Sequence, residues 1–199
     1  MLPNVIRNSS WARNVLASQN KFSRRRELSM ISVHTSFPAS LYRFQPQRSS
    51  GLFNYKKGGD IEDGVEVSAD GLVYPRVSND VPFSNGAVFM PNTFTMQEWV
   101  RTAYDDYIDG LEDGQSVPDT TILRVRKGTP IPSALTLFRD RSYRFSLQPS
   151  RPTNVNDLNN LLSDFYHQNA TFTNAEEWMD RNEYHNSIAD DAVGKWMCQ

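Results

Sequence analysis

The sequence predicts a single loop-rich α+β domain in which short strands are flanked by helices. Four short segments alternate apolar and polar residues between glycines and prolines, as half-buried strands do. These segments are FPASLYRFQ (37–45), TILRVR (121–126), ALTLF (134–138) and SYRFSLQ (142–148). Apolar residues recur at helical spacing in residues 95–111 and 154–168. The 11 prolines and 10 glycines favour this class over a helical bundle.

Length and composition limit the protein to one folded domain. At 199 residues, with 38% hydrophobic and 12% aromatic residues, the chain can bury a core of its own. Its single cysteine, Cys198, excludes an internal disulfide and favours a reducing, intracellular compartment. No apolar run approaches the roughly 20 residues that span a bilayer. We therefore expect no membrane partner and a location that is either cytoplasmic or mitochondrial.

Charge is distributed unevenly along the chain. Residues 1–26 contain six basic residues and no acid, whereas the remainder has the other 15 of the 21 basic residues and all 23 acidic ones. Such an acidic body argues against a nucleic-acid partner. The basic start resembles a mitochondrial transit peptide, but a flexible basic tail would have the same composition. The sequence thus predicts an extension over residues 1–36, dispensable for folding, and one domain over residues 37–199.

Arg43 is unusual because it lies inside an apolar strand segment. Strand alternation places Leu41 and Arg43 on one face, with Tyr42 and Phe44 on the other. Two interpretations stay open. Either Arg43 points into solvent from an edge strand, or its guanidinium lines a cleft and binds an anion through two hydrogen bonds.

Helix start signals precede three segments. Thr95 with Glu98 and Thr173 with Glu176 fit capping boxes, and Thr153 fits an N-cap. The last strand segment has Tyr143, Phe145 and Leu147 on one face, and Ser142, Arg144, Ser146 and Gln148 on the other. A polar face of this kind would be odd against a dry core, so we expect it to line a cleft.

Several common catalytic motifs are absent from the sequence. Neither a P-loop, a Gly-x-Ser-x-Gly elbow nor a Gly-x-Gly-x-x-Gly fingerprint is present. The three histidines and the cysteine lack metal-ligand spacing, so we expect no metal. The loop-like stretch 71–93 between two strand segments is where we expect a site.

Three blocks, taken together and in order, resemble a known family. They are Ser40-Leu41-Tyr42-Arg43; then Asp70-Gly71-Leu72 with Pro75 and Asn85-Gly86-Ala87-Val88; then residues 122–152, with a Gly-Thr-Pro-x-Pro turn and a Gln-Pro-Ser-Arg-Pro end. The chain is similar over residues 37–170 to the Tse-two-type ADP-ribosyltransferase toxin domain. That family is named for a bacterial type VI secretion effector, and this chain resembles its fungal-type members.

The resemblance implies an ADP-ribosyltransferase-type fold, with two facing antiparallel β-sheets and flanking helices around an NAD cleft. Arg43 matches the arginine of the first motif, which implies that it pairs with the NAD pyrophosphate or ribose. Tyr74 or Phe83 would stack on nicotinamide, and Ser84 and Gln148 would bind ribose. Catalytic roles would then fall to Arg43, Ser84 and Gln148.

The implied function is that of a toxin-like, cytotoxic effector enzyme. It would be an NAD-dependent ADP-ribosyltransferase or NAD glycohydrolase that cleaves the nicotinamide–ribose bond, with an unknown acceptor and an antitoxin protein as partners. Gln148 stands where many transferases of this fold have a glutamate, and an amide supplies no negative charge. The alternative is therefore an inactive module that binds NAD or sequesters a partner. In a competent cleft, Gln148→Glu is expected to raise turnover.

Overall fold

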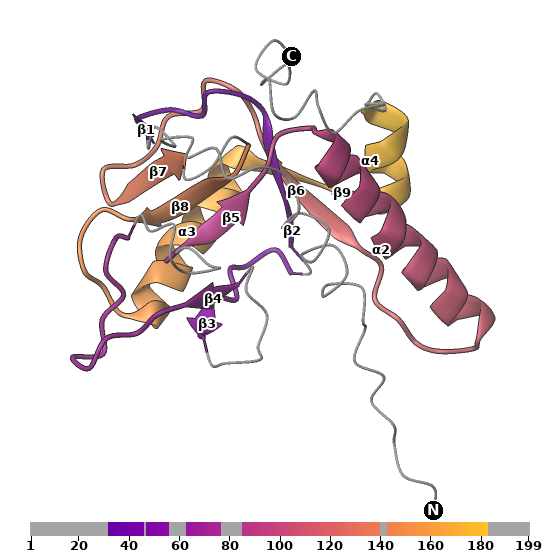
Figure 1. Ribbon diagram of the computed structural model, residues 1–199, viewed down its shortest axis with the longest axis horizontal. Helices are drawn as coiled ribbons and strands as arrows, with labels where there is room; N and C mark the ends of the chain where they lie inside the picture. The colour runs from indigo at the N-terminus through magenta and orange to yellow at the C-terminus, as the bar shows by residue number, and fades with distance from the viewer. Residues whose placement is uncertain (1–31, 46, 56–62, 77–84, 140–142, 183–199) are drawn as a thin grey trace, which may run out of the picture.

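The described part of the chain forms two antiparallel sheets, a short parallel strand pair and three helices (Figure 1). This computed structural model describes residues 32–45, 47–55, 63–76, 85–139 and 143–182. The strands are β1 (Ser32–His34), β2 (Leu41–Phe44), β3 (Phe53–Asn54), β4 (Gly64–Val65), β5 (Ala87–Phe89), β6 (Thr121–Val125), β7 (Leu135–Arg139), β8 (Phe145–Pro149) and β9 (Ala170–Asn174). The helices are α2 (Phe94–Glu112), α3 (Val155–Asn169) and α4 (Ala175–Arg181).

Two backbone hydrogen bonds join the two sheets at their edges. One sheet has the order β1-β7-β8-β5, the other β2-β6-β9, and every neighbouring pair is antiparallel. Tyr42 donates to the Met90 carbonyl at 2.7 Å, and Met90 donates back to Tyr42 at 2.8 Å. Strand β2 therefore lies next to β5, and a short parallel pair, β3-β4, is separate from both sheets. The predicted α+β class with antiparallel sheets is confirmed.

The core consists of two apolar clusters on opposite faces of β2. The larger cluster joins Leu41 to Phe89 and Leu147 on the other sheet and to the apolar face of α3. The smaller cluster joins Tyr42 and Phe44 to α2 and α4, which lie side by side in Figure 1. The predicted alternation along β2 is thus confirmed, and Arg43 shares the face of Leu41.

The helix starts differ from those the sequence predicts. Helix α2 is capped by Thr93, whose side chain accepts from the Met96 amide at 3.1 Å, so the capping box at Thr95 is wrong. Asn154 and Asn174 cap α3 and α4, so Thr153 and Thr173 are not the caps. Asparagine and threonine cap comparably well, and adjacent candidates are separated only by where the strand before them ends.

Strands β1 and β9 are among the short strands that were not recognised in the sequence. Strand β9 follows α3 directly and pairs along its whole length with β6, from Ala170 opposite Val125 to Asn174 opposite Thr121. Strand β1 pairs with β7, with Val33 opposite Phe138. The sheet therefore includes residues that composition assigns to the extension 1–36, while residues 1–31 lie outside the described part. No helix among the described residues is long and apolar enough to cross a membrane.

Truncation should locate the start of the folded domain. A chain that begins at Ser32 should keep the stability of the full chain, whereas one that begins at Phe37 loses β1 and the hydrogen bond from Ile131 to Thr35. We expect the shorter chain to lose about 1–2 kcal/mol, seen as a fall of several degrees in the melting temperature. Equal melting temperatures for the two truncated chains would show that β1 contributes nothing.

Candidate functional site

Arg43 is a buried cation at the seam between the two sheets. Its side chain is 5% exposed, because β2 turns it toward the larger core rather than toward solvent. The guanidinium forms an ion pair with Asp63, lies 5.9 Å from the centre of the Phe89 ring, and donates from Nη1 to the Val88 carbonyl at 3.5 Å. Arg43 therefore does not point into solvent, so the edge-strand interpretation is wrong, and its buried charge is paired with a carboxylate of the chain itself.

The hydroxyl of Tyr166, on α3, lies close to this ion pair. Tyr166 is fully buried, in edge contact with Phe89 across 6.3 Å between ring centres. Burial raises the pKa of Tyr166 to about 12, with the Arg43 charge lowering it and the Asp63 charge raising it. Its hydroxyl has no hydrogen-bond partner within the described residues, whereas buried tyrosines usually have one.

Gln148 clamps a neighbouring loop instead of facing an open cleft. Its side-chain carbonyl accepts from the Arg76 amide at 2.7 Å, and its Nε2 donates to the Arg76 carbonyl at 2.7 Å. Nε2 also donates to Ser146 Oγ at 2.9 Å. The two bonds to Arg76 resemble the pair of backbone bonds between neighbouring strands. They explain how Ser146 and Gln148 on the polar face of β8 can be buried, since both are hydrogen-bonded. Gln148 is 1% exposed, so its amide is already committed to the fold.

The structure does not bring Arg43 and Gln148 together. Strand alternation on β8 puts Gln148 and Ser146 on the face opposite Leu147. Arg43 instead lies over Phe89, which shares the core face with Leu147. The two predicted site residues therefore lie on opposite faces of the β5-β8 pair.

Tyr74 lies in the loop that Gln148 holds. Its ring is 40% exposed, and its hydroxyl donates to Asp70 at 2.6 Å. That bond lowers the pKa of Asp70 and raises the pKa of Tyr74. Asn85 fixes the same loop, because it donates to the Tyr74 carbonyl and accepts from the Glu66 amide, each at 3.0 Å. The predicted site residues Phe83 and Ser84 lie outside the described residues.

Gly86 explains why Asn-Gly appears in the second block. A Cβ at Gly86 would lie 2.3 Å from the Leu147 carbonyl oxygen and 2.8 Å from Gln148 Cγ. Any larger residue would push β8 away and disturb Gln148. Glycine is therefore required by close approach of the backbone here.

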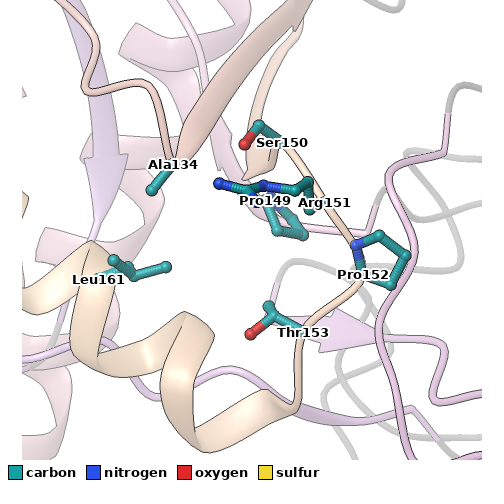
Figure 2. Close-up of a pocket in the computed structure, with 7 residues that line it drawn as sticks. All are labelled: Ala134, Pro149, Ser150, Arg151, Pro152, Thr153 and Leu161. Carbon is teal, nitrogen blue, oxygen red and sulfur yellow. The ribbon is translucent and has the colours of Figure 1, made fainter.

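A shallow pocket lies between the end of β8 and α3 (Figure 2). It has a volume of about 250 Å³ and is lined by Ala134, Leu161 and the segment Pro149–Thr153. Figure 2 shows the Arg151 guanidinium directed across it toward Ala134. None of the predicted site residues lines it, and it is smaller than the roughly 300–1,000 Å³ of usual ligand sites. Within the described residues, no cluster of three or more metal-ligating side chains occurs.

Sequence reasoning missed three residues at these positions. Asp63 is 20 residues from Arg43, and no local pattern marks it as the partner. Tyr166 reads in the sequence as one more apolar residue of α3. Asn85 carried a signal, since it belongs to the second block of the resemblance, but its two backbone contacts could not be foreseen.

Gln148→Glu should now destabilise the protein rather than improve it. A carboxylate there loses both Nε2 bonds and faces the Arg76 carbonyl in a buried site. Gln148→Met, of similar size, is the matched control that removes the bonds without adding charge. We expect a loss of about 1–3 kcal/mol for Met and a larger one for Glu, measured by urea denaturation at neutral pH. A glutamate variant as stable as the methionine variant would show that the carboxylate finds a partner.

Alkaline pH should weaken the fold through Tyr166. In the unfolded chain a tyrosine ionises near pH 10, whereas in the folded protein the pKa of Tyr166 is about 12. Stability is therefore full below about pH 10 and falls between pH 10 and 12, by up to about 2–3 kcal/mol. Tyr166→Phe should lack this part of the loss in chemical denaturation at pH 9 and 11. If the unaltered protein and Tyr166→Phe lose the same stability between pH 9 and 11, the phenol of Tyr166 is not buried as described.

The comparisons with known proteins agree with the family resemblance and with the fold. The model of the family described as Tse2 ADP-ribosyltransferase toxin matches residues 39–178, well over half of the chain. No curated protein and no solved structure matches the chain. The matched range begins just before β2 and ends in α4, so it includes Arg43, Gln148 and every strand of the two sheets except β1. The chain belongs to the Tse2 ADP-ribosyltransferase toxin family.

Proposed function

We propose that this protein binds NAD and cleaves its nicotinamide–ribose bond, passing ADP-ribose to an acceptor or to water. In such a reaction the carbon–nitrogen bond breaks, nicotinamide leaves with the bonding electrons, and an acceptor oxygen or nitrogen bonds to the ribose carbon. The observation that carries the proposal is the buried guanidinium of Arg43, which already pairs with a carboxylate. Arg43 lies on a strand within the residues that the family model matches. Phosphate oxygens suit the same fork of donors.

The role of each other residue follows from its contacts. Tyr74 is exposed and its hydroxyl is held by Asp70, so its ring would stack on nicotinamide. Gln148 supports the loop that carries Tyr74, so it acts on the site through that loop and not by touching ribose. Ser84 and Phe83 remain predicted ribose and nicotinamide contacts. An antitoxin protein and an acceptor are the proposed partners, and the cytoplasm or mitochondrion the proposed location.

A second candidate is an inactive module that binds NAD or sequesters a partner protein. It is favoured by the buried amide of Gln148, because the third motif then provides neither an acid nor an available side chain. The two candidates differ in one measurement. Nicotinamide release from NAD by the purified protein supports the enzyme, and NAD binding without release supports the module.

Arg43→Ala should weaken NAD binding by about 1.5–3 kcal/mol in a calorimetric titration, because charge-assisted hydrogen bonds to phosphate are lost. Nicotinamide release should fall in parallel. Arg43→Lys keeps the charge but not the fork, and should recover only part of the affinity.

The matched control is Arg124→Ala on the adjacent strand β6. Arg124 lies over the Tyr42 ring and donates to Ser40, away from Phe89 and Asp63. The Arg124→Ala substitution removes the same charge as Arg43→Ala and should leave NAD binding unchanged. Equal losses of NAD affinity in both variants would show that Arg43 acts only through net charge. If the unaltered protein does not bind NAD, both NAD-dependent candidates are wrong.

A further inference from the structure

The anion partner of Arg43 is supplied by the chain itself. Asp63 accepts from the guanidinium, and its side chain is 25% exposed while that of Arg43 is 5% exposed. The Asp63 main chain is held by the Phe53 amide at 3.1 Å, where β4 begins beside β3. Asp63 thus lies on the solvent side of Arg43 and covers it. A ligand cannot reach Arg43 in this arrangement unless the carboxylate leaves.

The second observation is the unused hydroxyl of Tyr166 beside the same pair. A buried phenol with no partner in the described part of the chain costs stability, and a ligand that accepted from it would remove that cost. The Tyr166 ring and the Arg43 guanidinium both lie against Phe89, with 6.3 Å between the two ring centres and 5.9 Å from the guanidinium to the Phe89 centre. The pKa of Tyr166 accordingly responds to both Arg43 and Asp63. A donor, a cation and a replaceable carboxylate therefore meet in one place.

We propose that Arg43, Asp63 and Tyr166 form a covered anion site, in which the Asp63 carboxylate occupies the position of a dinucleotide phosphate. When NAD binds, Asp63 leaves Arg43, a phosphate replaces the carboxylate, and the Tyr166 hydroxyl donates to a phosphate oxygen. This inference rests on the proposed function for the identity of the ligand.

The exchange is physically reasonable because a carboxylate and a phosphate make the same bonds to a guanidinium. Arg43 stays paired in both states, so the large cost of a lone buried charge is avoided. The pyrophosphate of NAD has more non-bridging oxygens than a carboxylate, so an oxygen that Arg43 does not hold can accept from the Tyr166 hydroxyl. Because Asp63 competes for Arg43, the apparent affinity for NAD is the intrinsic affinity multiplied by the fraction of molecules in which Asp63 has moved away.

Asp63→Asn is the direct test. It keeps the shape of the side chain and removes its charge, so Asp63 should compete less and NAD should bind about tenfold more tightly in a calorimetric titration. The matched control is Glu177→Gln, which removes an arginine-paired carboxylate from the surface of α4, where Glu177 pairs with Arg181. That variant should bind NAD as the unaltered protein does.

Tyr166→Phe tests the same site without disturbing the ion pair. Loss of a buried, unused hydroxyl should raise the melting temperature by about 2–4 °C. Loss of a donor to phosphate should weaken NAD binding about fivefold. A merely structural hydroxyl would give the opposite pattern, a lower melting temperature with unchanged binding, and that result would overturn its assigned role.

Further arms separate this inference from the proposed function. Unchanged NAD affinity in Asp63→Asn overturns the covered site while NAD binding itself stands. Unchanged affinity with lost nicotinamide release also overturns it, because Asp63 then acts in the chemistry. If Asp63→Asn melts below the titration temperature, Tyr166→Phe decides alone. Titration with ADP covers the case in which neither protein binds NAD. If ADP then binds more tightly to Asp63→Asn than to the unaltered protein, the anion site is upheld and the proposed function is wrong. Binding of neither overturns both.

Discussion

The pairing of Tyr42 with Met90 is the constraint on which the arrangement of the site depends. Its two hydrogen bonds are the described backbone link between β2 and β5, and so between the two sheets. With β2 placed in this way, the next residue, Arg43, must point at Val88 and Phe89. A slip of the β2 register by one residue would turn Arg43 to the other face, toward Trp178, and would turn Tyr42 away from it. The position of the cation is therefore a consequence of register.

Two buried polar side chains of this fold are satisfied by backbone far along the chain. Gln148 binds the main chain of Arg76, and Asn85 binds that of Tyr74 and Glu66. Such contacts make the neighbouring loops as well fixed as strands, although they contain little regular structure. The Tyr166 hydroxyl differs from these side chains, because it has no hydrogen-bond partner among the described residues, a condition that it shares with Trp178 Nε1.

Much of the fold could be predicted from sequence, since alternation and helical spacing are local properties. Strands β2, β6, β7 and β8 were found because each carries both faces within five residues. Strands β1 and β9 were missed because each presents few core side chains, and the exposed Val33 gives no alternation signal. The cap errors at Thr95, Thr153 and Thr173 arise because several competent residues stand together, and tertiary contacts choose among them.

Only part of the candidate site could be predicted from the sequence, because some of its contacts join distant segments. Arg43 was visible because a charge inside an apolar strand is rare. The partners Asp63 and Tyr166 are fixed by contacts between distant segments, which leave no local trace. Gln148 was placed on the correct face, but its contact with Arg76 spans 72 residues, so its structural use could not be foreseen.

The segment Val73–Arg76 has a consequence for how the molecule opens. Val73 exchanges two backbone hydrogen bonds with Thr153, and Arg76 is held at both polar atoms by Gln148. Although few of these residues belong to a strand, the segment is coupled to β8 and to the start of α3. Local unfolding of this loop must therefore break the hydrogen bonds that join it to β8 and to Thr153, just before α3. We therefore expect the loop to open together with β8, and the amide protons of Val73 and Arg76 to exchange slowly.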